Sequence, residues 1–346
     1  MQENSDIWAG VLGHESIKSG LVYALKTGKL HHALLFSGCA GVGKAMLARA
    51  LVACVMCTQS DITAGRLMRC GKCSHCLRIA SKTHPDVIDI EEKSATLKID
   101  RIRELQSRLV YAPYEGGRRF VLIDDAHKMN DAAANCLLKT LEEPEGNTTF
   151  ILISSQIQRL LPTIISRSQV LRFAPFDLES VERFLSKRGV MALQARTMAA
   201  LSMGSLGRAL DLGEAPESEE MLQIFDEILD MHSSMDIFSL AASLKGKKLI
   251  YEPLLLMLLM VLRDIQAFKA GLRRPATLVQ YADSMALSAE HSSEGDISRA
   301  FQLVEDVYQA LLGNANEVVA WERILLGCYR VIGKHKGFGT LRSSCI

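Results

Sequence analysis

The sequence predicts an α/β fold in which a parallel β-sheet covered by helices is followed by a region that is helical throughout. In the first half, short apolar runs alternate with segments of helical periodicity, as in a sheet whose strands are joined by helices. After Pro175 the strand signals stop and apolar residues recur only at helical spacing. The length of 346 residues is too great for most single cores, so we expect two or three domains.

Five short apolar runs are the expected strands of this sheet: residues 33–36, 87–90, 120–123, 150–153 and 170–173. Between them, apolar residues at helical spacing predict a helix from Ile99 to Leu109. Asn130 is placed to cap a further helix over 131–142.

The helical half is expected to begin with short amphipathic helices at 178–187 and 192–201. The acidic segment 213–220, which contains Pro216, predicts a linker, and only helical patterns follow it. The apolar run 254–262 is shorter than the roughly 20 residues that span a bilayer, so it predicts a buried helix.

The composition excludes several classes of partner. Forty Lys and Arg residues against 39 Asp and Glu give a formal net charge of +1, so no global field attracts DNA or a membrane. The polar start of the chain lacks the basic and apolar regions of a signal peptide, and we expect a cytoplasmic protein with no membrane partner. Nine cysteines, an odd number, indicate metal thiolates in a reducing compartment rather than a disulfide framework.

A glycine-rich stretch that resembles a phosphate-binding loop follows the first expected strand: Gly38-Cys39-Ala40-Gly41-Val42-Gly43-Lys44-Ala45. In such loops the glycines turn backbone N–H groups toward the phosphates, the lysine reaches the β- and γ-phosphates, and a final hydroxyl ligates Mg²⁺. Ala45 stands at that final position and offers the metal no oxygen. The loop therefore leaves binding of ATP with Mg²⁺ open and argues against hydrolysis.

Polar residues follow two later strands and complete the expected nucleotide site. Asp124 follows the strand 120–123 and could hold Mg²⁺ through water. Asp125 takes the place where active ATPases usually carry a glutamate that orients the attacking water, and its side chain is one methylene shorter. After the strand 150–153, Ser154 or Ser155 could contact a γ-phosphate, although two serines at a strand end are more often plain turn residues.

A cluster of cysteines predicts a structural zinc site. Cys70, Cys73 and Cys76 recur at a spacing typical of zinc ligands, and Cys57 upstream supplies a fourth thiolate. Cys54, His75 and His84 could each replace Cys57 as the fourth ligand. An iron–sulfur cluster is disfavoured because no further cysteine followed by proline comes after Cys76. Four protein ligands leave no open position for water, so no catalytic zinc is implied.

Two arginines stand at the ends of helical patterns. Arg167 lies in Ser166-Arg167-Ser168, just before the last expected strand, and Arg208 ends the stretch 204–208. On the sequence alone, an arginine in such a position is usually solvated or salt-bridged.

Taken together, these motifs resemble the clamp-loader subunits of bacterial DNA polymerase III, a branch of the AAA+ family. The resemblance covers the first 210 residues and rests on the motifs in their order along the chain: Gly13-His14, residues 29–36 leading into the loop, the inserted cysteine module, residues 124–129, residues 137–144 and Ser166-Arg167-Ser168. Residues 221–346 match the helical collar of that family only in length and helicity.

The resemblance implies an AAA+ domain at 1–174 with a zinc module at about 54–80, a helical lid at 175–214 and a helical collar at 215–346. It also implies a five-subunit ring, a component of the polymerase holoenzyme, that loads a sliding clamp onto primed DNA. The expected partners are the motor ATPase subunits, a delta-type subunit, the clamp and, through the assembled complex, DNA. In that family Arg167 would reach across an interface to the γ-phosphate of a neighbour, and Arg208 would sense nucleotide from the lid.

Three functions follow from these features. Ala45 and Asp125 favour a stator that hydrolyses little ATP and lends Arg167 to a neighbouring ATPase. A second function is that of an active motor ATPase whose Mg²⁺ is held by Asp124 and water alone. The third, a zinc-dependent nucleic-acid-binding module, is weaker because no basic, aromatic-rich stripe accompanies the cysteines.

Overall fold

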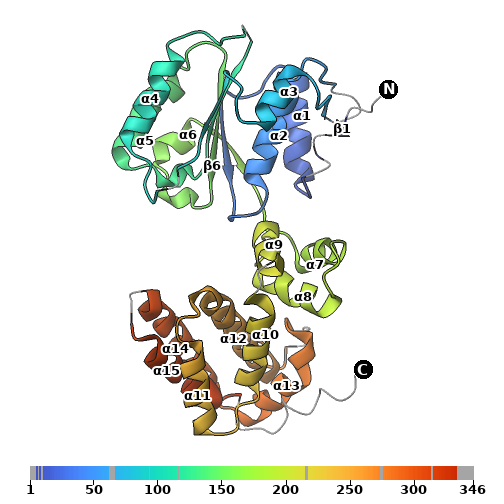
Figure 1. Cartoon of the computed structure of the whole chain (residues 1–346), viewed down its shortest axis with the longest axis vertical. Coiled ribbons are helices and arrows are strands. Elements are labelled where there is room, and N and C mark those ends of the chain that lie inside the picture. Colours follow the sequence, from blue (N-terminus) through green and yellow to red (C-terminus); the bar gives the residue numbers. More distant parts are fainter. Residues whose placement is uncertain are drawn as a thin grey trace. The chain divides into compact units, whose positions relative to one another are not determined.

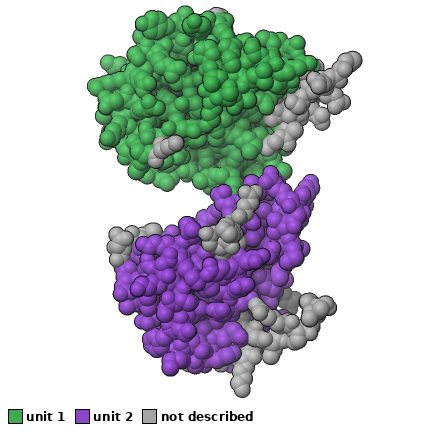
Figure 2. Space-filling model, in the orientation of Figure 1, with its two compact units in different colours: residues 1–176, 205–207 green, residues 177–204, 208–346 purple. Residues whose placement is uncertain are grey.

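The computed structural model describes residues 1–346 except 1–4, 7, 9–10, 62–66, 93, 116, 215–216, 273–275, 313–314 and 333–346. The chain forms two compact units, coloured separately in Figure 2. The first contains residues 1–176 and 205–207, and the second contains residues 177–204 and 208–346.

A five-stranded parallel sheet forms the centre of the first unit. Its strands are β2 (Ala33–Ser37), β4 (Val87–Ile90), β5 (Arg119–Ile123), β6 (Thr148–Ser154) and β7 (Gln169–Arg172), in the spatial order β4-β5-β6-β2-β7. Each neighbouring pair is parallel, and β2 lies between β6 and β7. All five predicted strands are confirmed to within two residues at either end. β2, β5 and β6 are buried along their whole length, which explains why they read as continuous apolar runs.

Helices cover both faces of this sheet (Figure 1). Helices α1 (Glu15–Lys26) and α2 (Lys44–Met56) pack on one face, where Leu34, Phe36 and Leu122 are buried. Helices α4 (Ile99–Leu109), α5 (Asp131–Glu142) and α6 (Pro162–Ser166) pack on the other, where Leu35 and Val121 are buried. Successive strand residues thus point to opposite cores, as the pleat requires.

Local signals set the ends of several helices in this unit. Asn130 caps α5 as predicted, because its side chain accepts a hydrogen bond from the N–H of Ala133 at 2.9 Å.

The sequence did not predict a small antiparallel sheet in which β1 (Ser5–Asp6) pairs with β3 (Met68–Arg69). Two-residue strands carry no periodicity, and their pairing depends on contacts more than 60 residues apart along the chain.

The second unit is helical wherever it is described, as predicted. Its helices are α7 (Leu178–Ser186), α8 (Ala192–Leu201), α9 (Leu206–Glu214, whose first two residues belong to the first unit), α10 (Glu217–Leu229), α11 (Ser234–Leu244), α12 (Lys248–Lys269), α13 (Ala282–His291), α14 (Glu294–Leu312) and α15 (Glu317–Tyr329), with a short 3₁₀ turn, η3 (Val279–Tyr281), before α13. The predicted buried helix at 254–262 is the middle of α12, where Leu254, Leu258 and Leu262 are fully buried.

The predicted linker at 213–220 is wrong in extent. Helix α9 continues to Glu214 and α10 begins at Glu217, while Pro216 lies outside the described residues. Acidic residues are favoured in the first turn of a helix, so the acidic composition that suggested a linker suits the start of α10. The boundaries of the lid and collar remain a proposal. Within the described residues, no helix is long and apolar enough to cross a bilayer.

Candidate functional site

The glycine-rich loop and the two polar strand ends lie along one edge of the parallel sheet. The loop follows β2, Asp124 follows β5, and Ser155 follows β6. Since β5, β6 and β2 are neighbours and parallel, their carboxyl ends meet at the same edge. Ligands of open α/β sheets bind at this edge. The structure therefore gathers the predicted nucleotide-site residues of the first unit at one edge of the sheet.

Close backbone packing and left-handed φ values explain why glycines stand in and beside this loop. A Cβ on Gly38 would lie 2.4 Å from the carbonyl oxygen of Phe173, the residue that follows β7. Gly41 and Gly43 have φ values of 71° and 99°, which L side chains rarely adopt. Gly207 packs on the outer side of the loop, where its N–H donates to the carbonyl of Gly41 at 2.9 Å. A Cβ on Gly207 would lie 2.9 Å from the Gly41 Cα.

Replacing Gly38 by alanine is expected to lower the free energy of unfolding by about 1–3 kcal/mol, because the new methyl group must displace a backbone carbonyl. Urea denaturation of the purified chain measures the change. The matched control is Gly20→Ala in α1, where no atom lies within 4 Å of the added Cβ and a helix gains from alanine. Equal losses in the two variants would contradict the packing explanation.

Lys44 is buried and engaged with its own loop. Its ammonium group donates to the carbonyls of Gly38 and Cys39, both at 2.6 Å. Burial lowers the pKa of Lys44, while the carboxylates of Asp124 and Asp125 act in the opposite direction. The next residue, Ala45, packs its methyl group against the apolar cluster beneath α2. The position that carries a metal-ligating hydroxyl in other phosphate-binding loops is therefore apolar in this chain.

Both aspartates after β5 make polar contacts with other residues of the chain. Asp124 is half-buried, burial raises its pKa, and its Oδ1 accepts the N–H of Asp125 at 3.0 Å. Asp125 adopts a left-handed conformation with φ 48°, and its Oδ2 forms an ion pair with Lys128 at 2.9 Å. The Asp125 carboxylate is thus turned toward a lysine of its own 3₁₀ turn, η1 (Ala126–Lys128).

The serines after β6 differ in burial. Ser154 is the last residue of β6 and is fully buried, with its Oγ accepting the N–H of Gln156 at 3.1 Å and lying 3.5 Å from the Nδ1 of His127. Ser155 is half-buried and directly follows the strand. His127 lies in the motif 124–129, but the sequence predicted no role for it in the site.

Arg167 lies at the opposite edge of the sheet. It follows α6 and precedes β7, so it stands near the amino ends of the strands, whereas the glycine-rich loop follows the carboxyl end of β2. The register pairs Leu34 with Gln169 and Ser37 with Arg172, and these four paired residues span about 10 Å. The Arg167 guanidinium forms an ion pair with Glu142, and about one-third of the Arg167 side chain is exposed. It cannot serve the loop of its own chain.

Arg208 belongs to the second unit. Its guanidinium forms an ion pair at 2.9 Å with Glu252 of α12, which joins the start of α9 to the long helix of that unit. Its predicted role in sensing nucleotide stays a proposal.

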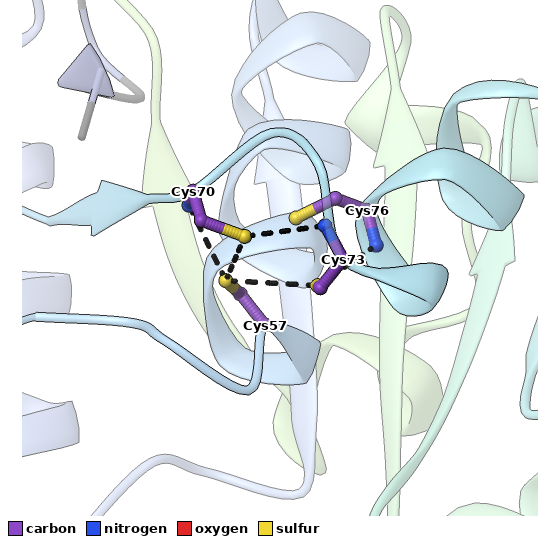
Figure 3. A group of neighbouring side chains, drawn as sticks. All are labelled: Cys57, Cys70, Cys73 and Cys76. Carbon is purple, nitrogen blue, oxygen red and sulfur yellow. Dashed lines mark hydrogen bonds between the residues drawn. The ribbon is translucent and has the colours of Figure 1, made fainter. Parts of the chain in front are cut away.

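The four predicted cysteines converge at one point (Figure 3). Cys57 ends α2, Cys70 follows β3, Cys73 caps helix α3 (Ser74–Ala80), and Cys76 lies in the first turn of that helix. All four Sγ atoms lie within 4.8 Å of one another, with Cys57 at 3.6 Å from Cys70 and 4.0 Å from Cys73. A tetrahedral zinc with Zn–S bonds of about 2.3 Å places its sulfurs about 3.8 Å apart, so the observed distances fit such a site.

The surroundings of these sulfurs shift their pKa values in both directions: hydrogen bonds lower the pKa of Cys70 and Cys73, and burial raises that of Cys57 and Cys76. Backbone N–H groups of Cys70, Cys73 and Cys76 point at the sulfurs of Cys57, Cys70 and Cys73, at 3.3–3.5 Å. Burial works against ionisation of Cys73, but the hydrogen bonds outweigh it and lower its pKa to about 6. Cys54 lies outside the cluster, because its Sγ faces the carbonyl of Met68 at 3.6 Å. The geometry thus places Cys57, rather than Cys54, in the cluster.

His75 and His84, which the sequence also offered as a fourth ligand, form a separate network with Glu115. The His84 Nδ1 accepts the N–H of Asp86 at 3.1 Å, so the neutral ring carries its proton on Nε2. That Nε2 lies 2.8 Å from the His75 Nδ1 and 3.4 Å from Glu115. The His75 Nδ1 also lies 3.0 Å from the Glu115 carboxylate, so the ligand atoms of the three side chains converge. These contacts join α3 to the segment before β5.

Comparison with known proteins places the first unit within a described family. A family model described as DNA polymerase III, delta subunit, matches residues 13–177. The chain is 34% identical to DNA polymerase III subunit delta' of Escherichia coli over 231 residues, which cover 66% of this chain and 68% of that protein. It is 29% identical to subunit delta' of Bacillus subtilis over 312 residues, which cover 88% and 93% of the two chains.

A second type of subunit also matches. The chain is 36% identical to DNA polymerase III subunit tau of Salmonella typhimurium over 212 residues, which cover 59% of this chain. The chain spans about a third of the length of that tau subunit, since the match covers 32% of it.

Proposed function

The chain belongs to the family of DNA polymerase III delta-prime subunits, and from that membership we propose that it is a clamp-loader subunit in bacterial DNA replication. In this role it assembles with motor ATPase subunits and a delta subunit into a ring that places a sliding clamp on primed DNA. The chain acts as a stator. It hydrolyses little ATP itself and supplies Arg167 to the γ-phosphate held by a neighbouring subunit.

The position of Arg167 is the observation that carries this proposal. The guanidinium stands near the amino edge of the sheet, away from its own phosphate loop, and one-third of its side chain is exposed. An arginine at the edge of a subunit can reach only the nucleotide of another subunit. Such an arginine stabilises the charge that develops on the transferred phosphoryl group.

The chain's own loop supports the stator role over the motor role. Ala45 offers no oxygen to Mg²⁺, and the Asp125 carboxylate forms an ion pair with Lys128. A misplacement of about 1 Å can cost about 100-fold in rate, so both departures act against hydrolysis. Gly38, Gly41, Gly43 and Lys44 still have the types and conformations that suit phosphate, which keeps nucleotide binding open.

The cysteine module has a structural role in this proposal. Cys57, Cys70, Cys73 and Cys76 hold one Zn²⁺, which ties the end of α2 to β3 and α3. Four thiolates fill the coordination sphere of zinc, so the metal supplies cross-linking and no Lewis-acid chemistry.

The stator and the active motor ATPase predict opposite results in one assay, the release of phosphate from ATP by the isolated chain. We expect turnover no faster than that of a Lys44→Ala variant, which reports any contaminating ATPase. Ala45→Thr is expected to strengthen binding of Mg²⁺-ATP without producing rapid turnover, because Asp125 stays paired with Lys128. Rapid turnover by the natural chain that disappears in Lys44→Ala would establish the motor function instead.

A further inference from the structure

Two groups of its own chain hold the Arg167 guanidinium. Its Nη2 forms an ion pair with the Glu142 carboxylate, and its Nη1 donates to the carbonyl of Thr163 at 3.2 Å. Glu142 is the last residue of α5, and Arg167 immediately follows α6. Leu141 and Ile164, which neighbour these contacts along the chain, are fully buried and fix both helix ends in the core. The guanidinium therefore has a defined resting position at the amino edge of the sheet.

The contacts leave the guanidinium able to bind an anion at the same time. A guanidinium has five N–H donors, and the contacts with Glu142 and Thr163 use two of them. The Arg167 side chain is 36% exposed and that of Glu142 is 47% exposed, so a face of the pair is open to solvent. Exposed ion pairs contribute little to stability, so loss of the Glu142 carboxylate should leave the fold intact.

We propose that Glu142 is a positioning residue for Arg167, which holds the guanidinium in the orientation that meets the γ-phosphate of a neighbouring subunit. This inference rests on the proposed function. A free arginine side chain must lose the freedom of several rotatable bonds when it engages a phosphate. A carboxylate that has already restricted those bonds lowers this cost, which appears in the rate of the chemical step. Since the carboxylate contributes an acceptor for the guanidinium, glutamine should replace it in part.

The experiment is a double-mutant cycle on the reconstituted complex, with steady-state ATP hydrolysis as the readout. Glu142→Ala is expected to lower kcat about threefold to tenfold with no change in KM for ATP, and Glu142→Gln is expected to recover most of the rate. In an Arg167→Ala background, Glu142→Ala should have no further effect, because there is no guanidinium left to position. The control is Glu143→Ala, which removes the exposed neighbouring carboxylate and should leave the rate unchanged.

The outcomes separate this inference from the proposed function. If Arg167→Ala leaves turnover unchanged, the arginine has no role in trans and the proposed function fails. If Arg167→Ala is slow but Glu142→Ala matches the natural chain, only the positioning role fails. A further loss of turnover when Glu142→Ala is added to Arg167→Ala would overturn the inference, because Glu142 would then act on the fold or the assembly, and gel filtration would show reduced complex. Faster turnover in Glu142→Ala would mean that the carboxylate restrains the arginine, which overturns the inference as well.

Discussion

Replacing Arg167 by alanine is expected to lower ATP hydrolysis at the interface that it serves by roughly 10³-fold, the lower end of the range for an arginine supplied in trans. The reason is that the transition state spreads negative charge over the γ-phosphoryl oxygens, and the guanidinium stabilises that charge. The Arg167 ion pair with Glu142 is partly exposed, so its loss should leave the fold and the assembly of the complex unaffected.

Hydrolysis by the reconstituted complex, measured with clamp and primed DNA, checks this expectation, and gel filtration checks assembly. Arg118→Ala is the matched control, because Arg118 is a half-buried arginine near the same edge of the sheet, where it donates to Asn147 at 3.2 Å. Arg167→Lys should recover little activity, since an ammonium group lacks the planar fork of the guanidinium. Equal turnover of the Arg167→Ala and Arg118→Ala complexes would rule out the role in trans.

The second large effect is expected at the metal site. The purified chain should contain one zinc ion, and Cys73→Ser should remove it and unfold the segment around 57–84. Structural zinc contributes about 10–16 kcal/mol of apparent binding free energy in small zinc-dependent peptides, so its loss is not offset by local packing. Serine supplies a hydroxyl that can cap α3 in place of the Cys73 sulfur. The substitution therefore tests the metal ligand rather than the helix cap.

Elemental analysis measures the metal, and limited proteolysis measures unfolding, with cleavage in the module expected to be at least about tenfold faster. Cys136→Ser is the control, because Cys136 lies outside the cluster and donates to Gln106 at 3.2 Å. Full zinc content in Cys73→Ser would remove this cysteine from the ligand set. Iron content and visible absorbance in the natural chain would instead show that the four cysteines hold an iron–sulfur cluster.

The elements that the sequence predicted are those whose signals are local. Asn130 capped α5 because its side chain reaches an N–H three residues away, and α8 has the predicted limits because its apolar residues recur at helical spacing. The β1–β3 pair escaped prediction because its two strands are distant along the chain. The acidic segment before Met221 was misassigned because negative charge suits both a linker and the first turn of a helix.

The candidate site shows the same division. Cysteine spacing identified the module, but the choice between Cys54 and Cys57 depends on which sulfur lies beside the other three, which spacing does not reveal. The position of Arg167 before the last strand was visible in the sequence. Its partner Glu142 was not, because their contact depends on how α5 packs against α6.

The parallel sheet has a further consequence for assembly. Its loop stands at one edge and Arg167 at the other, so under the proposed function one side of the subunit would accept a guanidinium and the other would donate one. Subunits with two unlike contact surfaces can join head to tail and close into a ring. A member that hydrolyses little ATP itself would then complete the catalytic site of one neighbour and need no arginine in return, so it could stand at the end of a series of active sites.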